Sequence, residues 1–164
     1  MPKKSFALTA MVAAGKMYLD SCVIVKLVSH EPDSAAYHEI VAGKPVVTSE
    51  LAVAEVRSAL LTKERAGRIS THARQVGWRL FQEKLRNEEF VLLPLNRHII
   101  ERAGAVIDQC HPKVALRTLD AIHVATAELF GGEEMCSSDD RVQKASDFIG
   151  LMLMLLKTDY LQNA

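Results

Sequence analysis

The fold is decided by residues 17–28, which read MYLDSCVIVKLV. The first three residues form a short apolar run of the kind that becomes a fully buried strand. Asp20 ends this run, and the apolar residues that follow it recur at helical spacing. A buried strand that leads through a single acid into a helix predicts an α/β domain built on a parallel sheet.

The same alternation continues along the chain. We expect further strands at 45–47, 90–93, 135–136 and 151–156, and helices near 34–41, 51–66, 70–86, 96–107, 118–130 and 140–146. Thr48 or Ser49 fits the N-cap of the helix that begins near residue 51. The pattern predicts a three-layer α/β/α domain around a parallel sheet of about five strands.

The length and composition fit one domain. The chain has 164 residues, 49% of them hydrophobic, and we expect a single domain over 17–164. Residues 1–16 are expected to be an N-terminal extension, either disordered or the product of a start codon assigned too early, with a weak signal-peptide pattern as the alternative. The three cysteines form no C-x-x-C pair, and no apolar run is long enough to span a bilayer. These features favour a cytoplasmic protein with reduced thiols and no membrane partner.

Charge is balanced overall but not locally. Twenty basic and twenty acidic residues cancel, so net charge points to no polyanionic partner. Residues 57–86 nevertheless contain eight Lys and Arg against two Glu. Such a stretch is either a solvated helix face or a surface that contacts nucleic acid phosphates, and Arg57 is the best single candidate for contact with a substrate or a partner.

Four acids occupy positions that a parallel sheet brings together. Asp20 and Asp139 each follow a predicted strand, where ligands bind in open α/β sheets. Glu55 lies on the apolar face of the helix after the second strand, and Asp120 lies in the first turn of its helix. Taken singly, an Asp after a strand is often only a turn residue or a helix cap. Their shared placement favours a site.

Four converging carboxylates need a counter-charge. Two of them about 4 Å apart repel by roughly 4 kcal/mol at an effective dielectric of about 20. Either some are protonated or a cation binds, and oxygen-only ligands favour Mg²⁺ or Mn²⁺ over zinc. Mg²⁺ usually joins carboxylates to phosphate oxygens, so the pattern indicates metal-assisted hydrolysis of a phosphodiester.

Four segments resemble the signature segments of PIN-domain ribonucleases, with an order and spacing similar to VapC-type toxins of bacterial toxin–antitoxin pairs. They are MYLDSCVIVKL at 17–27, SELAVAEVRSAL at 49–60, LRTLDAIHVATA at 116–127 and CSSDDRVQKAS at 136–146. The resemblance implies a metal-dependent endoribonuclease that uses Mg²⁺ or Mn²⁺, cleaves RNA, forms a homodimer and is neutralised by a cognate antitoxin protein.

By motif position, the resemblance assigns Asp20, Glu55, Asp120 and Asp139 to the acidic quartet that binds metal and carries catalysis. It places the hydroxyl residues Thr118 and Ser137 beside the metal centre.

Two positions depart from the family pattern. Cys22 stands where the family usually has Ser or Thr, and a thiol is a weaker hydrogen-bond partner. The fourth segment has two adjacent acids. The family tends to have an apolar residue three positions after the fourth acid and a small residue six positions after it. Val142 and Ala145 fit this spacing from Asp139, so Asp139 is chosen and Asp140 is kept as an alternative that lies beside the metal ligands.

Competing functions remain. An aspartyl phosphatase would need a second nearby Asp, which Asp20-Ser21-Cys22 lacks. The serious alternative is a catalytically silent PIN-like module that binds RNA or protein. His123, three residues after Asp120, either approaches the site or is a buried structural histidine.

Overall fold

The structure, a computed structural model, describes residues 15–130 and 134–156. Its elements in chain order are β1 (Met17–Leu19), α2 (Ser21–Val28), α3 (Ser34–Val41), β2 (Val46–Ser49), α4 (Leu51–Arg65), α5 (Thr71–Arg86), β3 (Phe90–Leu93), α6 (Arg97–Cys110), α7 (Thr118–Phe130), β4 (Glu134–Cys136) and α8 (Asp140–Phe148). The predicted alternation of strands and helices is confirmed.

The four strands form one parallel sheet in the order β3-β2-β1-β4. The chain builds the sheet outward from β1 through β2 to β3 and then returns to place β4 on the other side of β1. The strand order therefore reverses between β1 and β4. In open parallel sheets a ligand site lies beyond the carboxyl ends of the strands at such a point.

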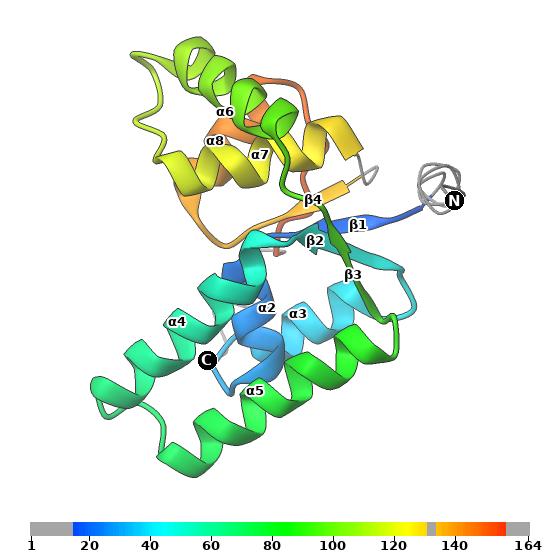
Figure 1. Cartoon of the computed structure of the whole chain (residues 1–164), viewed down its shortest axis with the longest axis vertical. Coiled ribbons are helices and arrows are strands. Elements are labelled where there is room, and N and C mark those ends of the chain that lie inside the picture. The colour runs from blue at the N-terminus through cyan, green and yellow to red at the C-terminus, as the bar shows by residue number, and fades with distance from the viewer. Residues whose placement is uncertain (1–14, 131–133, 157–164) are drawn as a thin grey trace.

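Helices cover both faces of the sheet (Figure 1). Helices α2, α3, α4 and α5 lie on one face, and α6, α7 and α8 lie on the other. The side chains of β1 alternate between the two cores, since Met17 and Leu19 pack with the first set and Tyr18 packs with the second. All three are fully buried. The three-layer α/β/α prediction is confirmed.

The predicted fifth strand at 151–156 is wrong. This segment makes one isolated parallel bridge, between Leu153 and Met135, instead of a ladder. Met152 is 63% exposed and Leu155 is 48% exposed, so burial adds little to hold the segment as a strand.

The predicted cap of α4 also needs correction, because Thr48 and Ser49 both lie in β2. The N-cap is Glu50, and the Ser49 hydroxyl instead accepts a hydrogen bond from the Leu51 N–H at 3.2 Å. The expected extension at 1–16 lies almost wholly outside the described residues. Within the described ranges, none of the helices combines the length and apolar content that crossing a bilayer requires.

Candidate metal centre

Asp20 is the best-fixed acid of the site. It follows β1 directly, and its backbone N–H donates to the Cys136 carbonyl of the neighbouring strand β4 at 3.0 Å. The residue is only 5% exposed. The Ser137 hydroxyl, which follows β4, donates to Asp20 Oδ2 at 2.6 Å. The two strand ends at the reversal point are thus joined by one short hydrogen bond.

Cys22 takes over part of the role of the hydroxyl that the family pattern expects. Its thiol lies 3.3 Å from Asp20 Oδ2 and accepts from the Ser138 N–H at 3.3 Å. Burial, followed by the charge of Asp20, raises the pKa of the Cys22 thiol to about 12. The thiol therefore stays protonated at neutral pH and can donate to Asp20.

Glu55 reaches the same place from the opposite direction. It lies near the start of α4 with its side chain 21% exposed, and its Oε2 is 2.6 Å from Nε2 of His123. The same nitrogen is 3.7 Å from Asp20 Oδ1, so the imidazole lies beside both carboxylates. Burial alone lowers the pKa of His123, but the bond to Glu55 and the charge of Asp20 outweigh it and the net pKa is raised.

Asp120 has an unmet polar group. It lies in the first turn of α7, and its buried Oδ2 has no hydrogen-bond partner among the described residues. Burial raises the pKa of Asp120, and the charges of Asp139 and Asp20 raise it further. The last two effects show that the three acids face one another electrostatically. A buried, unpartnered carboxylate oxygen turned toward other anions is the arrangement that a cation would satisfy.

Asp139 and Asp140 are adjacent but lie in different surroundings. Asp139 is the N-cap of α8, and its Oδ1 accepts from the Arg141 N–H at 2.8 Å. Burial alone would raise the pKa of Asp139, but hydrogen bonds and charge from Arg141 hold it below its usual value. Asp140 is exposed in the first turn of α8. The carboxylate whose charge acts on Asp120 is therefore Asp139.

We call Asp20, Glu55, Asp120 and Asp139 the acid cluster. Within residues 15–130 and 134–156, no three Asp, Glu, His or Cys side chains already form a group close enough to hold an ion. Mg²⁺ keeps several waters and needs only one or two protein carboxylates as direct ligands, so the donor set still fits such an ion.

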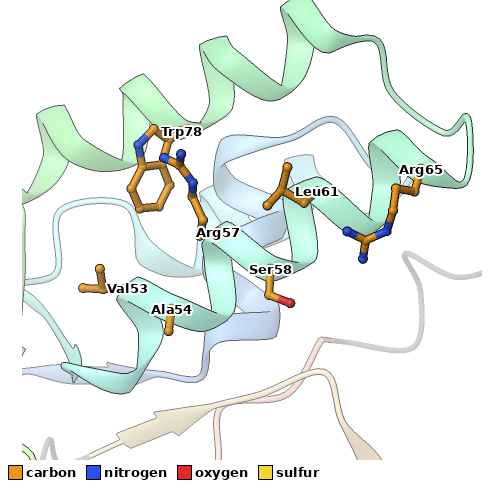
Figure 2. A pocket seen from close by; sticks show the side chains of 7 residues that line it. All are labelled: Val53, Ala54, Arg57, Ser58, Leu61, Arg65 and Trp78. Atoms are coloured by element: carbon orange, nitrogen blue, oxygen red, sulfur yellow. The ribbon is translucent and has the colours of Figure 1, made fainter.

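Two predicted residues lie apart from these contacts. Thr118 is exposed at the first position of α7. Arg57 is exposed on α4 and its guanidinium carbon lies 4.6 Å from the centroid of the Trp78 ring of α5. Figure 2 shows Arg57 turned toward Trp78 across the two helices. Arg57 was expected to contact a substrate or a partner, and its side chain lies on the surface shared by α4 and α5.

That surface is an open groove of about 470 Å³ between the two helices. We call it the α4–α5 groove. It is lined by Val53, Ala54, Arg57, Ser58, Leu61, Arg65 and Trp78. All of these except Trp78 come from α4 (Figure 2). The lining is mostly apolar and includes two arginines and a tryptophan.

The basic stretch 57–86 divides into two kinds of residue. Half of its eight cations form ion pairs with acids, namely Lys63, Arg74, Lys84 and Arg86. In the part of the chain that the structure describes, the other four form no ion pair, namely Arg57, Arg65, Arg68 and Arg79. Two of these four line the groove. Part of the local excess of positive charge predicted from sequence therefore lies at the α4–α5 groove.

Three further residues contact the acids or their partners. Tyr18 and Arg141 were not predicted as part of the site, whereas His123 was expected either to approach the site or to be a buried structural histidine. The Tyr18 hydroxyl lies 2.7 Å from Nδ1 of His123, and His123 itself contacts Glu55. Arg141 forms an ion pair with Asp139 at 3.4 Å. The spacing of three residues after Asp120 gave a signal for His123. Arg141 is two residues from an expected acid, but Tyr18 reads from sequence only as a core residue.

Comparison with known proteins agrees with this geometry. Residues 17–147 match the family described as PIN domain. Ribonuclease VapC46 of Mycobacterium tuberculosis is 36% identical over 141 residues, covering 84% of this chain and 95% of that protein.

Solved structures share the fold at low identity. A structure of VapBC2 from Rickettsia felis bound to a promoter DNA fragment has a TM-score of 0.60 and 11% identity, covering 85% of this chain and 97% of that chain. FitAcB from Neisseria gonorrhoeae has a TM-score of 0.60 and 16% identity, over 85% and 96%. VapC20 of M. tuberculosis, described as a toxin that cleaves the sarcin-ricin loop, has a TM-score of 0.61 and 16% identity, over 79% and 94%.

Proposed function

Since the chain belongs to the PIN domain family, we propose that it is the toxin endoribonuclease of a toxin–antitoxin pair. Its substrate is RNA, and it hydrolyses phosphodiester bonds with Mg²⁺ or Mn²⁺ bound at the acid cluster. The observation that carries the proposal is the buried, unpartnered Oδ2 of Asp120, which faces the charges of Asp139 and Asp20. The full-length relation to a ribonuclease supports RNA as the substrate class.

The roles of the acids follow from their surroundings. Asp20, Asp120 and Asp139 would hold the cation, directly or through water, and Glu55 would complete the site or orient the attacking water. A bound cation would lower the pKa of a coordinated water and stabilise negative charge on the phosphoryl oxygens. Ser137 and Cys22 fix the Asp20 carboxylate by donating to Oδ2. Thr118, exposed at the start of α7, would hydrogen-bond either a metal-binding carboxylate or the scissile phosphate.

The test is cleavage of a labelled RNA by purified wild type and Asp20→Asn. We expect cleavage that requires Mg²⁺ or Mn²⁺, stops with EDTA, and falls by at least about a hundredfold in the variant, since one preorganised charge is lost. Asp108→Asn, an exposed change on α6, is the matched control and should cleave normally. Persistent cleavage by rigorously purified Asp20→Asn would overturn the assignment.

Asp139→Asn and Asp140→Asn separate the two adjacent acids. We expect the first to reduce cleavage strongly and the second to leave most of it, because Asp140 is exposed and Asp139 acts on Asp120. The reverse order would move the fourth role to Asp140. If wild type binds RNA but cleaves none under any metal condition, the catalytically silent module is the correct function.

The α4–α5 groove fits a protein partner. Its apolar lining with Arg57 and Arg65 is complementary to an amphipathic segment that carries acidic residues, and we propose that this segment belongs to the cognate antitoxin. Trp78→Ala should weaken antitoxin binding about 10- to 100-fold, as expected when a buried aromatic anchor is removed. Val76→Ala, an exposed change on the same helix outside the groove, is the control. Equal affinities for the two variants would exclude this surface.

The expected homodimer is a separate proposal. Light scattering coupled to size-exclusion chromatography measures it directly, and a monomeric mass at micromolar concentration would contradict it.

A further inference from the structure

A chain of hydrogen bonds crosses the core from the sheet to the acid cluster. The Tyr18 hydroxyl of β1 lies 2.7 Å from Nδ1 of His123 on α7, and Nε2 of the same ring lies 2.6 Å from Oε2 of Glu55 on α4. Tyr18 is fully buried and His123 is 1% exposed. Three elements that are distant in sequence are thus connected through one imidazole ring.

The partners of His123 determine where its proton lies. An ionised Glu55 carboxylate offers only acceptors, so Nε2 must carry a hydrogen to bond with it. In a neutral imidazole the other nitrogen, Nδ1, is then an acceptor, and the Tyr18 hydroxyl must donate to it. Burial raises the pKa of Tyr18 well above its ordinary value, so the hydroxyl keeps its hydrogen. When the imidazole is neutral, all the bonds therefore run in one direction, from Tyr18 to His123 to Glu55. When the ring is protonated both nitrogens donate, and Nε2 still donates to Glu55.

The imidazole also separates two like charges. Its Nε2 lies 3.7 Å from Asp20 Oδ1 while it bonds Glu55 Oε2. Without a donor at this point, Glu55 would be a partly buried carboxylate facing another carboxylate, and its side chain would turn toward solvent to escape the repulsion. The His123 N–H offsets that repulsion and holds one oxygen of Glu55 at a defined place.

We propose that His123 is a positioning residue for Glu55, and that Tyr18 fixes the imidazole tautomer that makes this possible. The inference rests on the proposed function, because it gives Glu55 the orientation that metal and water binding require. Helix α7 then serves the site twice, since it carries both Asp120 and, one turn later, the ring that holds Glu55. A residue that orients a metal-binding carboxylate from behind typically accounts for a 10- to 100-fold effect.

Three variants test the proposal. His123→Leu removes the donor at similar size and should reduce cleavage by about 10- to 100-fold. His123→Gln retains an N–H near the Nε2 position and should restore most of that loss. Tyr18→Phe removes only the hydroxyl and should give an intermediate loss, because the ring can then adopt the wrong tautomer. His98→Gln on the exposed face of α6 and Tyr37→Phe on α3 are the matched controls and should behave as wild type.

A double-mutant cycle separates positioning from a general loss of packing. In a Glu55→Gln background, His123→Leu should cause little further loss of cleavage, because the group that it positions has already been changed. A further loss equal to that seen in wild type would overturn the proposal. So would failure of His123→Gln to restore activity when its thermal unfolding matches that of wild type.

Two readouts do not depend on cleavage. Nitrogen-15 NMR distinguishes protonated from unprotonated imidazole nitrogens, and at alkaline pH we expect the hydrogen of His123 on Nε2 in wild type and a mixture of tautomers in Tyr18→Phe. Calorimetric titration with Mn²⁺ should give about 10- to 100-fold weaker binding in His123→Leu. A hydrogen on Nδ1 in wild type would overturn the proposal even if the protein never cleaves RNA. Absence of cleavage with the expected tautomer and Mn²⁺ binding would contradict only the proposed function.

Discussion

The acid cluster and the α4–α5 groove share helix α4 but are built in opposite ways. Each acid of the cluster has its side chain at least partly buried, and two of the four are held by groups from other segments, since Ser137 donates to Asp20 and His123 bonds Glu55. The groove consists largely of exposed side chains, and Arg57 of α4 contacts the Trp78 ring of α5 across it. Glu55 and Arg57 are two residues apart on α4, yet one faces the core and the other faces the groove.

The two regions are therefore suited to different tasks. Catalysis depends on groups that are held in place before the substrate arrives, and under the proposed function the hydrogen bonds of Asp20, Glu55 and Asp139 serve that need. Recognition of a partner tolerates side chains that adjust on binding, and the exposed side chains of the groove are free to adjust in this way. Changes in the cluster should therefore alter metal binding and rate, whereas changes in the groove should alter affinity for a partner.

Asp120→Asn breaks the acid cluster most directly. Its pKa is raised by burial and by the charges of Asp139 and Asp20, so the folded state holds this proton more tightly than the unfolded chain does. Stability is then lost as pH rises from the ordinary value of 3.8 through the raised one. At neutral pH without metal, we expect the uncharged variant to melt at a higher temperature than wild type.

The same variant should lose its response to Mn²⁺. An ion at about 100 times its dissociation constant stabilises wild type by about 2.7 kcal/mol, and Asp120→Asn should show almost none of this. Differential scanning fluorimetry with and without Mn²⁺ measures both effects, with Asp108→Asn as the control. Trp78→Ala should keep the full Mn²⁺ response, which would sharpen the contrast between the two regions. A normal Mn²⁺ shift in Asp120→Asn would contradict the metal centre.

Much of the fold could be predicted because its signals are local. Helical and strand periodicity, with Pro and Gly as boundaries, located the four strands, since each depends on residues close together in the chain. The error at 151–156 came from reading apolar residues as a strand. A strand also needs a continuous ladder and burial, whereas this segment makes one isolated bridge and leaves Met152 and Leu155 exposed.

The candidate site shows the same division. The acids could be named because their positions relative to strands and helices are sequence features. The residues that hold them could be predicted only in part, because the bond between Tyr18 and His123 joins positions 105 residues apart. Arg57 shows a different limit. The sequence could not tell whether it lies beside the acids or on a separate surface, because residues two apart on a helix point in different directions.

Gly77→Ala should break the groove while leaving the acid cluster in place. A Cβ at Gly77 in α5 would lie 2.6 Å from the Val28 carbonyl oxygen of α2, which is backbone and cannot turn aside. Helix α5 must then move away and carry the adjacent Trp78 with it. We expect a loss of about 1–3 kcal/mol in the free energy of unfolding, measured by urea denaturation.

Gly104→Ala is the matched control for this change. It lies inside helix α6, and a Cβ there would meet nothing within 4 Å. Replacing an unstrained helical glycine with alanine should stabilise the protein by about 0.5–1 kcal/mol. Effects of the same sign for the two glycines would show that α5 is not seated against α2 as described.

Glu31→Gln should weaken the packing of α2 against α4 beside the groove, with a smaller loss of stability than Gly77→Ala. The Glu31 carboxylate accepts from Lys26 of α2 at 2.7 Å and pairs with Lys63 of α4, so it ties the two helices together. These side chains are partly buried, and we expect the variant to lose about 1 kcal/mol of unfolding free energy at neutral pH. Glu83→Gln, whose partner Arg86 lies 3.9 Å away at an exposed position, is the control and should lose roughly 0.3 kcal/mol or less.

The pH dependence identifies the charge as the cause of this effect. Burial alone would raise the pKa of Glu31, but the hydrogen bonds and charges of Lys26 and Lys63 outweigh it and the net pKa is lowered. The stabilisation is therefore present above the ordinary value of 4.5 and is lost as pH falls through the lowered one. The difference between wild type and Glu31→Gln should shrink across that range in urea denaturation. A difference that stays constant into acid would mean that Glu31 joins α2 to α4 through packing alone and that its charge does not stabilise this end of the groove.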